Sequence, residues 1–429
     1  MCMEFLTPGE KLRKIRKELN MTQSDFADES MTRSYVGMIE VGKRNLNPSI
    51  AALIIEKLNA RAKELNVEIS IDVDYLTMSR EEEAERYCKN IMENNPTEEQ
   101  VNSVIENALK YGLKETGANG YKVLGDMKFE QYQYLDAFLA YNSSLDICKT
   151  IGKVDIQCYL INRLGICKYY ELDYVEALLY FNRAQQYAVE FNDINVEVNA
   201  IFNIALTYNK MEKFEEAKNY VDLYVSKIHD FSDYEEMHAQ ANILKSNCMK
   251  SQGNKEEAIL ILKETLSNLK GIRKDTEGMI YNNLGGLYLD KDDYDSSLSA
   301  FNKSENIRGE YDEAVLSHTI IHKAELYIKK ELYTEATLLL KMGCDIAKKY
   351  NDNYYLILGY NFLIDIYEKM DKLEKAEEVY HSIIDLADKK DNSLELLKAY
   401  LKLADLYIKQ NRIEDASNII KLSQKISGN

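Results

Sequence analysis

Small and apolar residues recur along most of the chain with a regular period. A small residue is followed four positions later by a large apolar one, and this pair returns in steps of 39 to 41 residues. Residues four apart lie on one face of a helix. Each pair therefore predicts a helix that packs closely against a neighbour. The pairs are Ala137/Tyr141, Ala177/Phe181, Ala217/Val221, Ala258/Leu262, Ser297/Phe301, Ala336/Leu340, Ala376/Tyr380 and Ala416/Ile420.

A second small position precedes each pair by twelve residues and predicts a second helix in each period. A small apolar residue stands there in Leu124-Gly125, Leu164-Gly165, Ile204-Ala205, Leu284-Gly285, Lys323-Ala324 and Leu403-Ala404. Ser246 and Ile364 depart from this small apolar type. The pattern resembles the tetratricopeptide repeat, with a period longer than the usual 34 residues. Eight such repeats over about residues 118 to 427 imply stacked helix pairs in a right-handed superhelix with a concave face.

The N-terminal stretch has a different pattern. Leu12, Ile15 and Leu19 predict a helix over Pro8 to Leu19, and a fourth helix is expected over Pro48 to Leu58. Between them, Thr22 and Thr32 have the residue type of an N-cap. They predict one short helix that runs to about Glu29 and a second that begins at Arg33.

In the second short helix, Val36 and Ile39 share one face, which leaves Arg33, Ser34, Gly37 and Met38 on the other. Two short helices with a tight turn and an outward second helix form a helix-turn-helix. The runs GEKLRKIRKELNMTQ and SYVGMIEVGKRN resemble the DNA-binding domain of phage-repressor-like (Xre-type) regulators over roughly residues 7 to 66.

The resemblance implies a role for individual residues. Gln23 matches a glutamine that clamps a phosphate and braces the reading helix, and Arg33 and Ser34 match base-contacting positions. Tyr35, Gly37 and Met38 would line the groove, and Lys43 and Arg44 would contact phosphates. The alternative for Arg33 is a solvated surface cation, and for Lys43 and Arg44 an ordinary charge at a helix C-terminus. Arg16 and Glu40 match an internal ion pair. The full set of expected DNA-contacting residues is Thr22, Gln23, Thr32, Arg33, Ser34, Tyr35, Gly37, Met38, Lys43 and Arg44.

Charge is unevenly distributed. Residues 1–66 carry a net charge of +2 and the remainder −19, within a total of −17. Only the head is suited to bind a polyanion. The chain has no long apolar run and no apolar signal core, so we expect a cytoplasmic protein that does not enter a membrane. Its seven cysteines are odd in number and form no C-x-x-C, which favours buried reduced thiols.

Asparagines recur on the first helix of the repeats, where side chains should face the groove: Asn162, Asn199, Asn203, Asn242, Asn282 and Asn361. An amide both donates and accepts, so such a row could pair with the backbone of a bound peptide. The alternative is that asparagines fall there by frequency. His318 and His322 have metal-ligand spacing but no recognisable partner. We expect no metal, no cofactor and no enzymatic activity.

From head to last repeat, the chain resembles the RRNPP family of Gram-positive peptide-pheromone receptors, and most closely its neutral-protease-regulator branch. The resemblance implies an all-α protein with a five-helix helix-turn-helix domain (1–66), a junction with a possible atypical first repeat (67–117) and a tetratricopeptide superhelix (118–429). It implies a quorum-sensing transcription regulator that binds operator DNA and a short signalling oligopeptide, as a homodimer or higher oligomer. Two alternatives remain: repeats that sequester a phosphorelay response regulator, or a plain repressor with repeats for dimerisation.

Overall fold

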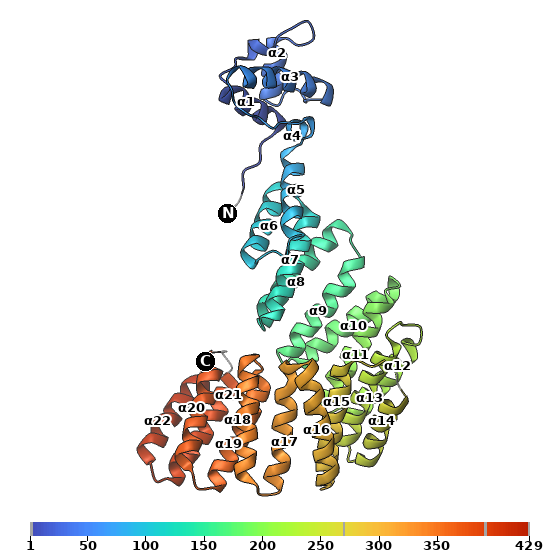
Figure 1. Cartoon of the computed structure of the whole chain (residues 1–429), viewed down its shortest axis with the longest axis vertical. Coiled ribbons are helices and arrows are strands. Elements are labelled where there is room, and N and C mark those ends of the chain that lie inside the picture. Colours follow the sequence, from blue (N-terminus) through green and yellow to red (C-terminus); the bar gives the residue numbers. More distant parts are fainter. Residues whose placement is uncertain (1–2, 269–270, 390–392, 428–429) are drawn as a thin grey trace. The chain divides into compact units, whose positions relative to one another are not determined.

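The computed structural model describes residues 3–268, 271–389 and 393–427, and these residues form helices and no strand (Figure 1). The chain divides into two compact units, Met1–Met211 and Glu212–Asn429. We describe each unit separately. The all-α fold predicted from the sequence is confirmed.

The head has five helical elements around one apolar core. They are α1 (Pro8–Glu18), η1 (Gln23–Phe26), α2 (Arg33–Glu40), α3 (Pro48–Glu64) and α4 (Val73–Thr77). Leu12, Phe26, Val36, Ile54 and Leu58 are fully buried in this core. The apolar spacing in the sequence therefore identifies the buried faces of α1, α2 and α3.

Two boundaries in the head differ from expectation. The first short helix ends at Phe26 instead of Glu29, because Ala27 is extended (φ −73°, ψ 132°) and Asp28 closes a turn. The alternation of apolar and polar residues over residues 67–79 is typical of an extended segment, but this stretch contains α4, which is capped by the Asp72 side chain. Within it, residues 67–72 and 78–79 lack helical structure.

Beyond the head, helices follow one another in antiparallel pairs. The first unit continues with α5 (Arg80–Met92), α6 (Glu98–Tyr111), α7 (Lys114–Glu130), α8 (Tyr134–Ile151), α9 (Asp155–Tyr170), α10 (Tyr174–Glu190) and α11 (Ile194–Lys210). The second unit contains α12 (Phe214–Lys227), α13 (Tyr234–Ser251), α14 (Lys255–Asn268), α15 (Lys274–Leu289), α16 (Tyr294–Tyr311), η2 (Glu313–Val315), α17 (Leu316–Lys329), α18 (Tyr333–Lys349), α19 (Asn353–Lys369), α20 (Leu373–Lys389), α21 (Ser393–Lys409) and α22 (Ile413–Ser427). The last two residues of the predicted repeat domain, 428–429, lie outside the described residues.

Small residues allow the two helices of a repeat to approach closely. A Cβ added to Gly165 of α9 would lie 2.6 Å from the ring of Phe181 on α10, and Gly285 and Phe301 repeat this contact between α15 and α16. The aromatic ring occupies the space that a side chain on the first helix would need. In these helix pairs, the small and large positions of the sequence pattern are therefore packing partners.

The turn between the two helices of a repeat needs one residue with left-handed backbone. This residue has a φ between 55° and 65° at Tyr132, Leu172, Glu212, Asp292, Glu331, Asp371 and Asn411, and the equivalent Gly253 has a φ of 86°. The turn recurs from the first repeat to the last.

Two sets of contacts hold the head on α5 and α6. The Lys11 ammonium of α1 is buried; it donates to the carbonyls of Tyr75 and Met78 (both 3.0 Å) and lies 2.7 Å from Glu83 of α5. Residues 3–6 form an arm that runs from α1 to α6. There the Met3 N–H donates to Asn107, and the Phe5 N–H donates to the Tyr111 hydroxyl (3.0 Å).

The six described cysteines are buried and form no disulfide with one another, whereas Cys2 lies outside the described residues. Burial raises the pKa of the Cys88 thiol to about 11 and that of Cys344 to about 12. Thiols with such pKa values are not reactive nucleophiles.

Candidate functional site

The recognition helix α2 presents its first turn to solvent. The Thr32 hydroxyl caps the helix by accepting a hydrogen bond from the Tyr35 N–H (3.2 Å). Thr32, Arg33 and Ser34 are exposed, while Val36 and Ile39 are buried in the head core. The cap fixes where the helix begins, so Arg33 and Ser34 project from its N-terminal end.

A buried ion pair braces the other end of α2. Arg16 donates from Nε to Glu40 Oε1 (2.5 Å) and from Nη2 to Oε2 (3.1 Å), and its Nη1 also reaches the Met21 carbonyl (2.7 Å). Burial acts to raise the pKa of Glu40, but the hydrogen bonds from Arg16 and Gln23 outweigh it, and the net pKa is lowered. Glu40 is therefore an anion at neutral pH and links α1 to α2.

Gln23 is the third member of this brace. Its Nε2 donates to Glu40 Oε2 (2.9 Å), so part of its amide is engaged inside the head. Gly37 faces the same amide, because a Cβ at this position would lie 3.3 Å from Gln23 Oε1. Gly37 and Met38, expected to line the DNA groove, are half-buried. An amide with one N–H engaged retains a second N–H that could reach a phosphate.

The turn between η1 and α2 is held by a single carboxylate. Asp28 Oδ1 accepts from the backbone N–H groups of Ser30 (2.8 Å) and Met31 (3.0 Å), and Asp28 also pairs with Lys57 of α3. The Lys57 hydrogen bond, followed by those of Ser30, lowers the pKa of Asp28. These contacts give the turn a fixed shape and set α2 against α3.

Three exposed cations lie at the two ends of α2. Arg33, Lys43 and Arg44 are exposed, and none of them has a carboxylate within ion-pair distance among the described residues. Thr22 and Tyr35 flank them, exposed and half-buried respectively. Arg33 lies at the N-terminal end of α2, and Lys43 and Arg44 follow its C-terminal end, so all three cations are free to meet a polyanion.

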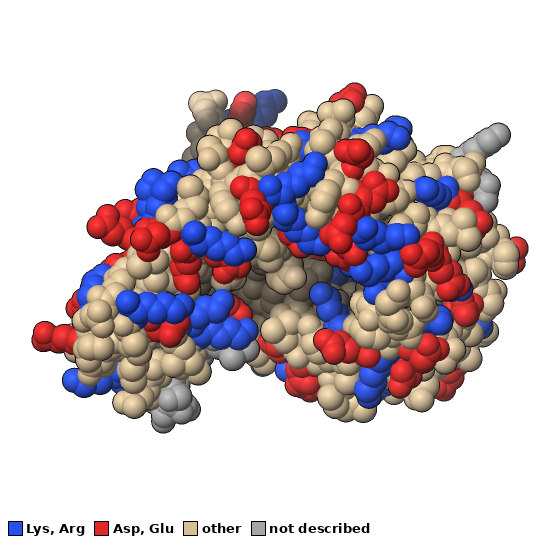
Figure 2. Space-filling model, turned by 90° about the horizontal axis from the view of Figure 1, so that it is seen from below, with Lys and Arg blue, Asp and Glu red and all other residues tan. Residues whose placement is uncertain are grey.

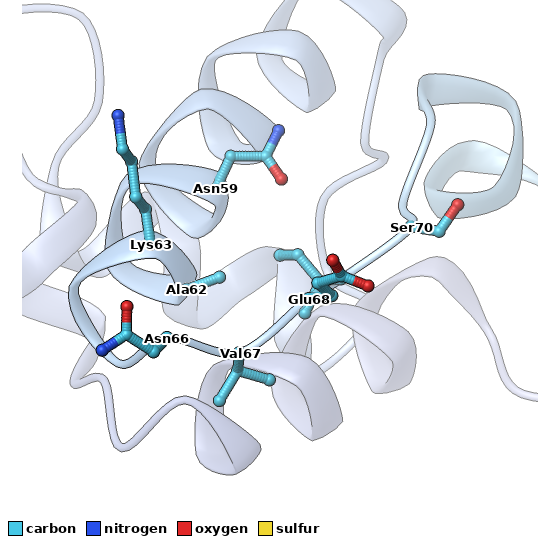
Figure 3. A pocket seen from close by; sticks show the side chains of 8 residues that line it. Asn59, Ala62, Lys63, Asn66, Val67, Glu68 and Ser70 are labelled. Atoms are coloured by element: carbon cyan, nitrogen blue, oxygen red, sulfur yellow. The ribbon is translucent and has the colours of Figure 1, made fainter.

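The head also has an open hollow of about 730 Å³, away from the residues of α2 (Figure 3). It is lined by the C-terminal half of α3, including Asn59 and Lys63, and by the segment that follows, including Val67, Glu68 and Ser70. None of the residues expected to contact DNA lines it. The hollow is therefore separate from the exposed end of α2.

In the first unit, two of the predicted asparagines pair with each other. Asn203 of α11 donates from Nδ2 to Asn162 Oδ1 of α9 (3.1 Å). Asn162 is 6% exposed, and Asn199, one turn before Asn203, is exposed. The pair joins the first helices of two successive repeats, as expected for residues that share one face of the repeat.

In the second unit, Asn282 lines a cavity of about 140 Å³ between α13, α15 and α17. Its amide contacts His322 Nδ1, with Nδ2 at 3.1 Å and Oδ1 at 3.3 Å. Burial, followed by the nearby charges of His318, Lys250 and Arg308, lowers the pKa of His322 to about 4. The imidazole is neutral at pH 7, so this cavity offers neutral donors and acceptors beside the ion pair of Lys250 and Asp290 (2.9 Å).

The other two predicted asparagines of this unit lie elsewhere. Asn242 donates to Thr265 of α14 (3.0 Å), and Asn361 donates to the Ile357 carbonyl within α19 (3.0 Å). Neither lines the cavity. Asn247 and Asn283 do line it, and sequence reasoning missed them. Each of them shares a helix face with a residue three positions later, Lys250 and Gly286, which also lines the cavity. This spacing was the one sign in the sequence that they face the same space.

The two histidines of α17 have different partners. His318 Nε2 lies 2.6 Å from Asp352 Oδ2, and its ring stacks on Tyr355 at 3.6 Å. Sequence reasoning recognised no carboxylate partner, because Asp352 is 34 residues away. Within the described ranges, no three His, Cys, Asp or Glu side chains lie close enough to hold a metal ion.

Acidic and basic side chains alternate over the face of the molecule in Figure 2, without one continuous patch of either sign. The acidic excess of the body is therefore dispersed on this face. In the described part of the chain, none of the helices combines the length and apolar character needed to cross a membrane.

Comparisons with known proteins agree with this architecture. A helix-turn-helix family matches residues 12–65, and a tetratricopeptide repeat family matches residues 198–226, 280–314 and 397–429. No curated protein sequence matches the chain. Both matched families describe regulatory or repeat domains, and neither describes an enzyme.

Among solved structures, the apo form of the quorum sensor NprR from B. thuringiensis has 20% sequence identity and a TM-score of 0.51, and the match covers 77% of this chain and 99% of that one. PlcR from Bacillus thuringiensis, in complex with the peptide PapR7 and DNA, has 13% identity and a TM-score of 0.33, with 76% and 98% covered. Aspartyl phosphate phosphatase F from Bacillus subtilis has 14% identity and a TM-score of 0.45, with 100% and 96% covered. The family matches show a helix-turn-helix domain followed by tetratricopeptide repeats, and about three quarters of the chain shares the fold of NprR; the domain content and fold expected from the resemblance to the RRNPP receptors are thus confirmed.

Proposed function

We propose that this protein is a cytoplasmic, non-catalytic transcription regulator that binds operator DNA through α2 and a short signalling peptide through its repeats. The observation that carries the proposal is the exposed N-terminal end of α2 in the head. Arg33 and Ser34 project from a capped helix whose far end is braced by Arg16, Glu40 and Gln23. Such a helix end is suited to reach base edges in a major groove.

Arg33 is expected to carry sequence discrimination. An arginine that grips guanine with two hydrogen bonds contributes about 1–3 kcal/mol of discrimination. Arg33→Ala should therefore weaken binding to the preferred operator by that amount and relax the preference at one base pair. The measurement is fluorescence anisotropy with the DNA upstream of the gene and with variants of each base pair.

Lys43→Ala is the matched control, since Lys43 is an equally exposed cation expected to contact phosphate. It should weaken binding to all sequences alike and lower the salt slope by about one. An Arg33→Ala protein that keeps full preference at every base pair would contradict the base-reading role.

Support for peptide binding comes from the second unit. The cavity beside Asn282 holds about 140 Å³, which is room for one side chain or a short stretch of backbone. Asn247, Asn283 and His322 provide further neutral polar groups around it. Each hydrogen bond to a peptide would contribute only about 0.5–1.5 kcal/mol, so affinity needs several such contacts.

Asn282→Ala should weaken peptide binding by about 0.5–1.5 kcal/mol, because it removes one amide from the cavity. Synthetic peptides of about five to ten residues, taken from the small reading frame expected beside the gene, are the probes. Calorimetry with the full chain measures the affinity. The control is Asn219→Ala, an exposed asparagine on α12, which should leave it unchanged.

The DNA-binding assay with and without peptide tests the whole proposal. A peptide-dependent change in operator affinity is the expected result. The alternatives stated from the sequence give other results: capture of a response regulator by a chain that lacks residues 1–66 favours sequestration, and operator binding that ignores every peptide favours a repressor whose repeats only dimerise.

A further inference from the structure

The first two regular repeats expose apolar side chains in register on their second helices and the preceding turns. We name these six residues the apolar ladder, and their exposed fractions run from 52% for Tyr132 to 68% for Leu179. They form three rungs forty residues apart in sequence: Tyr132/Leu172, Leu135/Val175 and Leu139/Leu179. The helices α8 and α10 lie side by side, since the rings of Phe138 and Tyr180 are 5.8 Å apart.

Later repeats are polar where the ladder is apolar. Two positions before the small residue, the first two repeats have Leu135 and Val175, whereas the others have Glu215, Glu256, Asp295, Thr334, Glu374 and Glu414. At the position of Leu139 and Leu179, later repeats expose only single leucines, Leu260 and Leu338. The ladder is therefore a property of two adjacent repeats and not of the repeat fold.

The backbone gives independent evidence that the ladder is retained for its side chains. Tyr132 and Leu172 have left-handed backbone, with φ of 62° and 65°. A bulky apolar residue is disfavoured there, whereas glycine, asparagine and aspartate tolerate this conformation. Four of the six equivalent turns in later repeats use Gly253, Asp292, Asp371 or Asn411, and the other two use the charged residues Glu212 and Glu331, so a bulky apolar or aromatic residue stands only in the two turns of the ladder. Since Tyr132 and Leu172 are more than half exposed, core packing does not explain their presence.

We propose that the apolar ladder is the surface on which a second copy of this chain docks. The inference rests on the proposed function and on the homodimer that the resemblance implies, because helix-turn-helix domains read paired half-sites. A two-fold axis brings a patch against itself, which requires a self-complementary patch. The ladder meets this requirement, because its two halves on α8 and α10 are both apolar and follow the same spacing.

Size and charge are consistent with a second copy. Six side chains that are each more than half exposed amount to several hundred Å² of apolar surface, near the most that a monomer usually leaves uncovered. That is a suitable core for an interface of about 800 Å² per partner with a polar rim. Beyond the ladder, exposed Asp146 on α8 and Arg183 on α10 carry opposite charges. Asp146 already pairs with Lys149 on the same helix (3.0 Å), so these charges belong to a polar rim around the apolar ladder.

Sedimentation equilibrium of the full chain, with and without peptide, tests the proposal. The double variant Leu135→Glu/Val175→Glu installs the residue type that later repeats use, and it should raise the dimer dissociation constant at least tenfold. Both positions are exposed, so the circular dichroism and melting temperature of the monomer should not fall. Leu338→Glu, an equally exposed leucine on α18, is the matched control and should leave association unchanged.

A second variant addresses the strained turns. Tyr132→Asn/Leu172→Asn should weaken association while it keeps or raises monomer stability, because asparagine accepts the left-handed backbone. A wild-type chain that is monomeric under all conditions, or a glutamate variant that dimerises as tightly as the wild type, overturns the inference.

The same samples separate this inference from the proposed function. The glutamate variant should bind peptide with unchanged affinity, since the ladder and the Asn282 cavity lie in different units. If wild type binds peptide and DNA but the ladder variants dimerise normally, only the docking surface is wrong. If no peptide binds but the ladder variants lose dimerisation, the docking surface holds and peptide sensing is wrong.

Discussion

Replacement of Arg16 by alanine should destabilise the head by about 3–5 kcal/mol, because it leaves a buried carboxylate without its partner. Glu40 is 5% exposed and receives two hydrogen bonds from Arg16. The remaining donor, Gln23 Nε2, is neutral and cannot compensate the charge. Folded domains usually have a free energy of unfolding of about 5–15 kcal/mol. The head would therefore lose much of its stability, and α2 would lose its fixed position.

Hydrogen exchange of the full chain measures this effect locally. Amides of α1 and α2 should lose protection in Arg16→Ala, while those of the repeats should not. Lys14→Ala, an exposed change on the same helix, is the control and should be within about 0.5 kcal/mol of wild type. Unchanged protection in α2 would show that the ion pair does not support the reading helix.

Acid should reproduce part of this loss. The pKa of Glu40 is lower in the folded head than its unfolded value of about 4.3, so its contribution is fully present above pH 4.3 or so. It is lost as pH falls through the folded value.

In the repeats, Phe181→Ala should cost about 3–5 kcal/mol of local stability, since it removes a ring that is 1% exposed between α9 and α10. Amides of these two helices should exchange faster, because each repeat depends on its nearest neighbours. Val189→Ala on the exposed face of α10 is the control, with a change of no more than about 0.5 kcal/mol.

Gly165, which packs against the Phe181 ring, gives a second test, because the effect of its substitution depends on whether that ring is present. In the wild type, Gly165→Ala places a Cβ 2.6 Å from the Phe181 ring and should destabilise by about 1–3 kcal/mol. In the Phe181→Ala background the ring is absent, and the same change should cost much less, because the nearest remaining atom is the Tyr180 Cβ at 3.1 Å and alanine favours a helix over glycine. Additive effects would mean that Gly165 and Phe181 are not packing partners.

The parts that the sequence predicted well are those set by local spacing. The small and large positions, four and twelve residues apart, predicted the helix pairs because both follow from helix geometry. The N-cap of α2 was also predicted from residue type, since the Thr32 hydroxyl accepts a hydrogen bond from the N–H of Tyr35, three positions later.

Spacing alone could not predict contacts between residues that are distant in sequence. The turn that follows η1 is held in part by the pair of Asp28 with Lys57, 29 residues later. The asparagine row had the right period, but Asn162 pairs with Asn203 and Asn282 with His322, about one repeat away in each case. Which amide lines a cavity depends on these pairings, and periodicity alone does not determine them.

The contacts of the arm and of Lys11 have a mechanical consequence. Three separate anchors, at Asn107, Tyr111 and Glu83, join the head to α5 and α6. A load applied to α6 would therefore turn the head with it instead of bending a hinge between them. In the proposed dimer, a signal that changes the angle between the two heads would therefore have to enter the chain after α6, and a small tilt there would become a sideways displacement of Arg33.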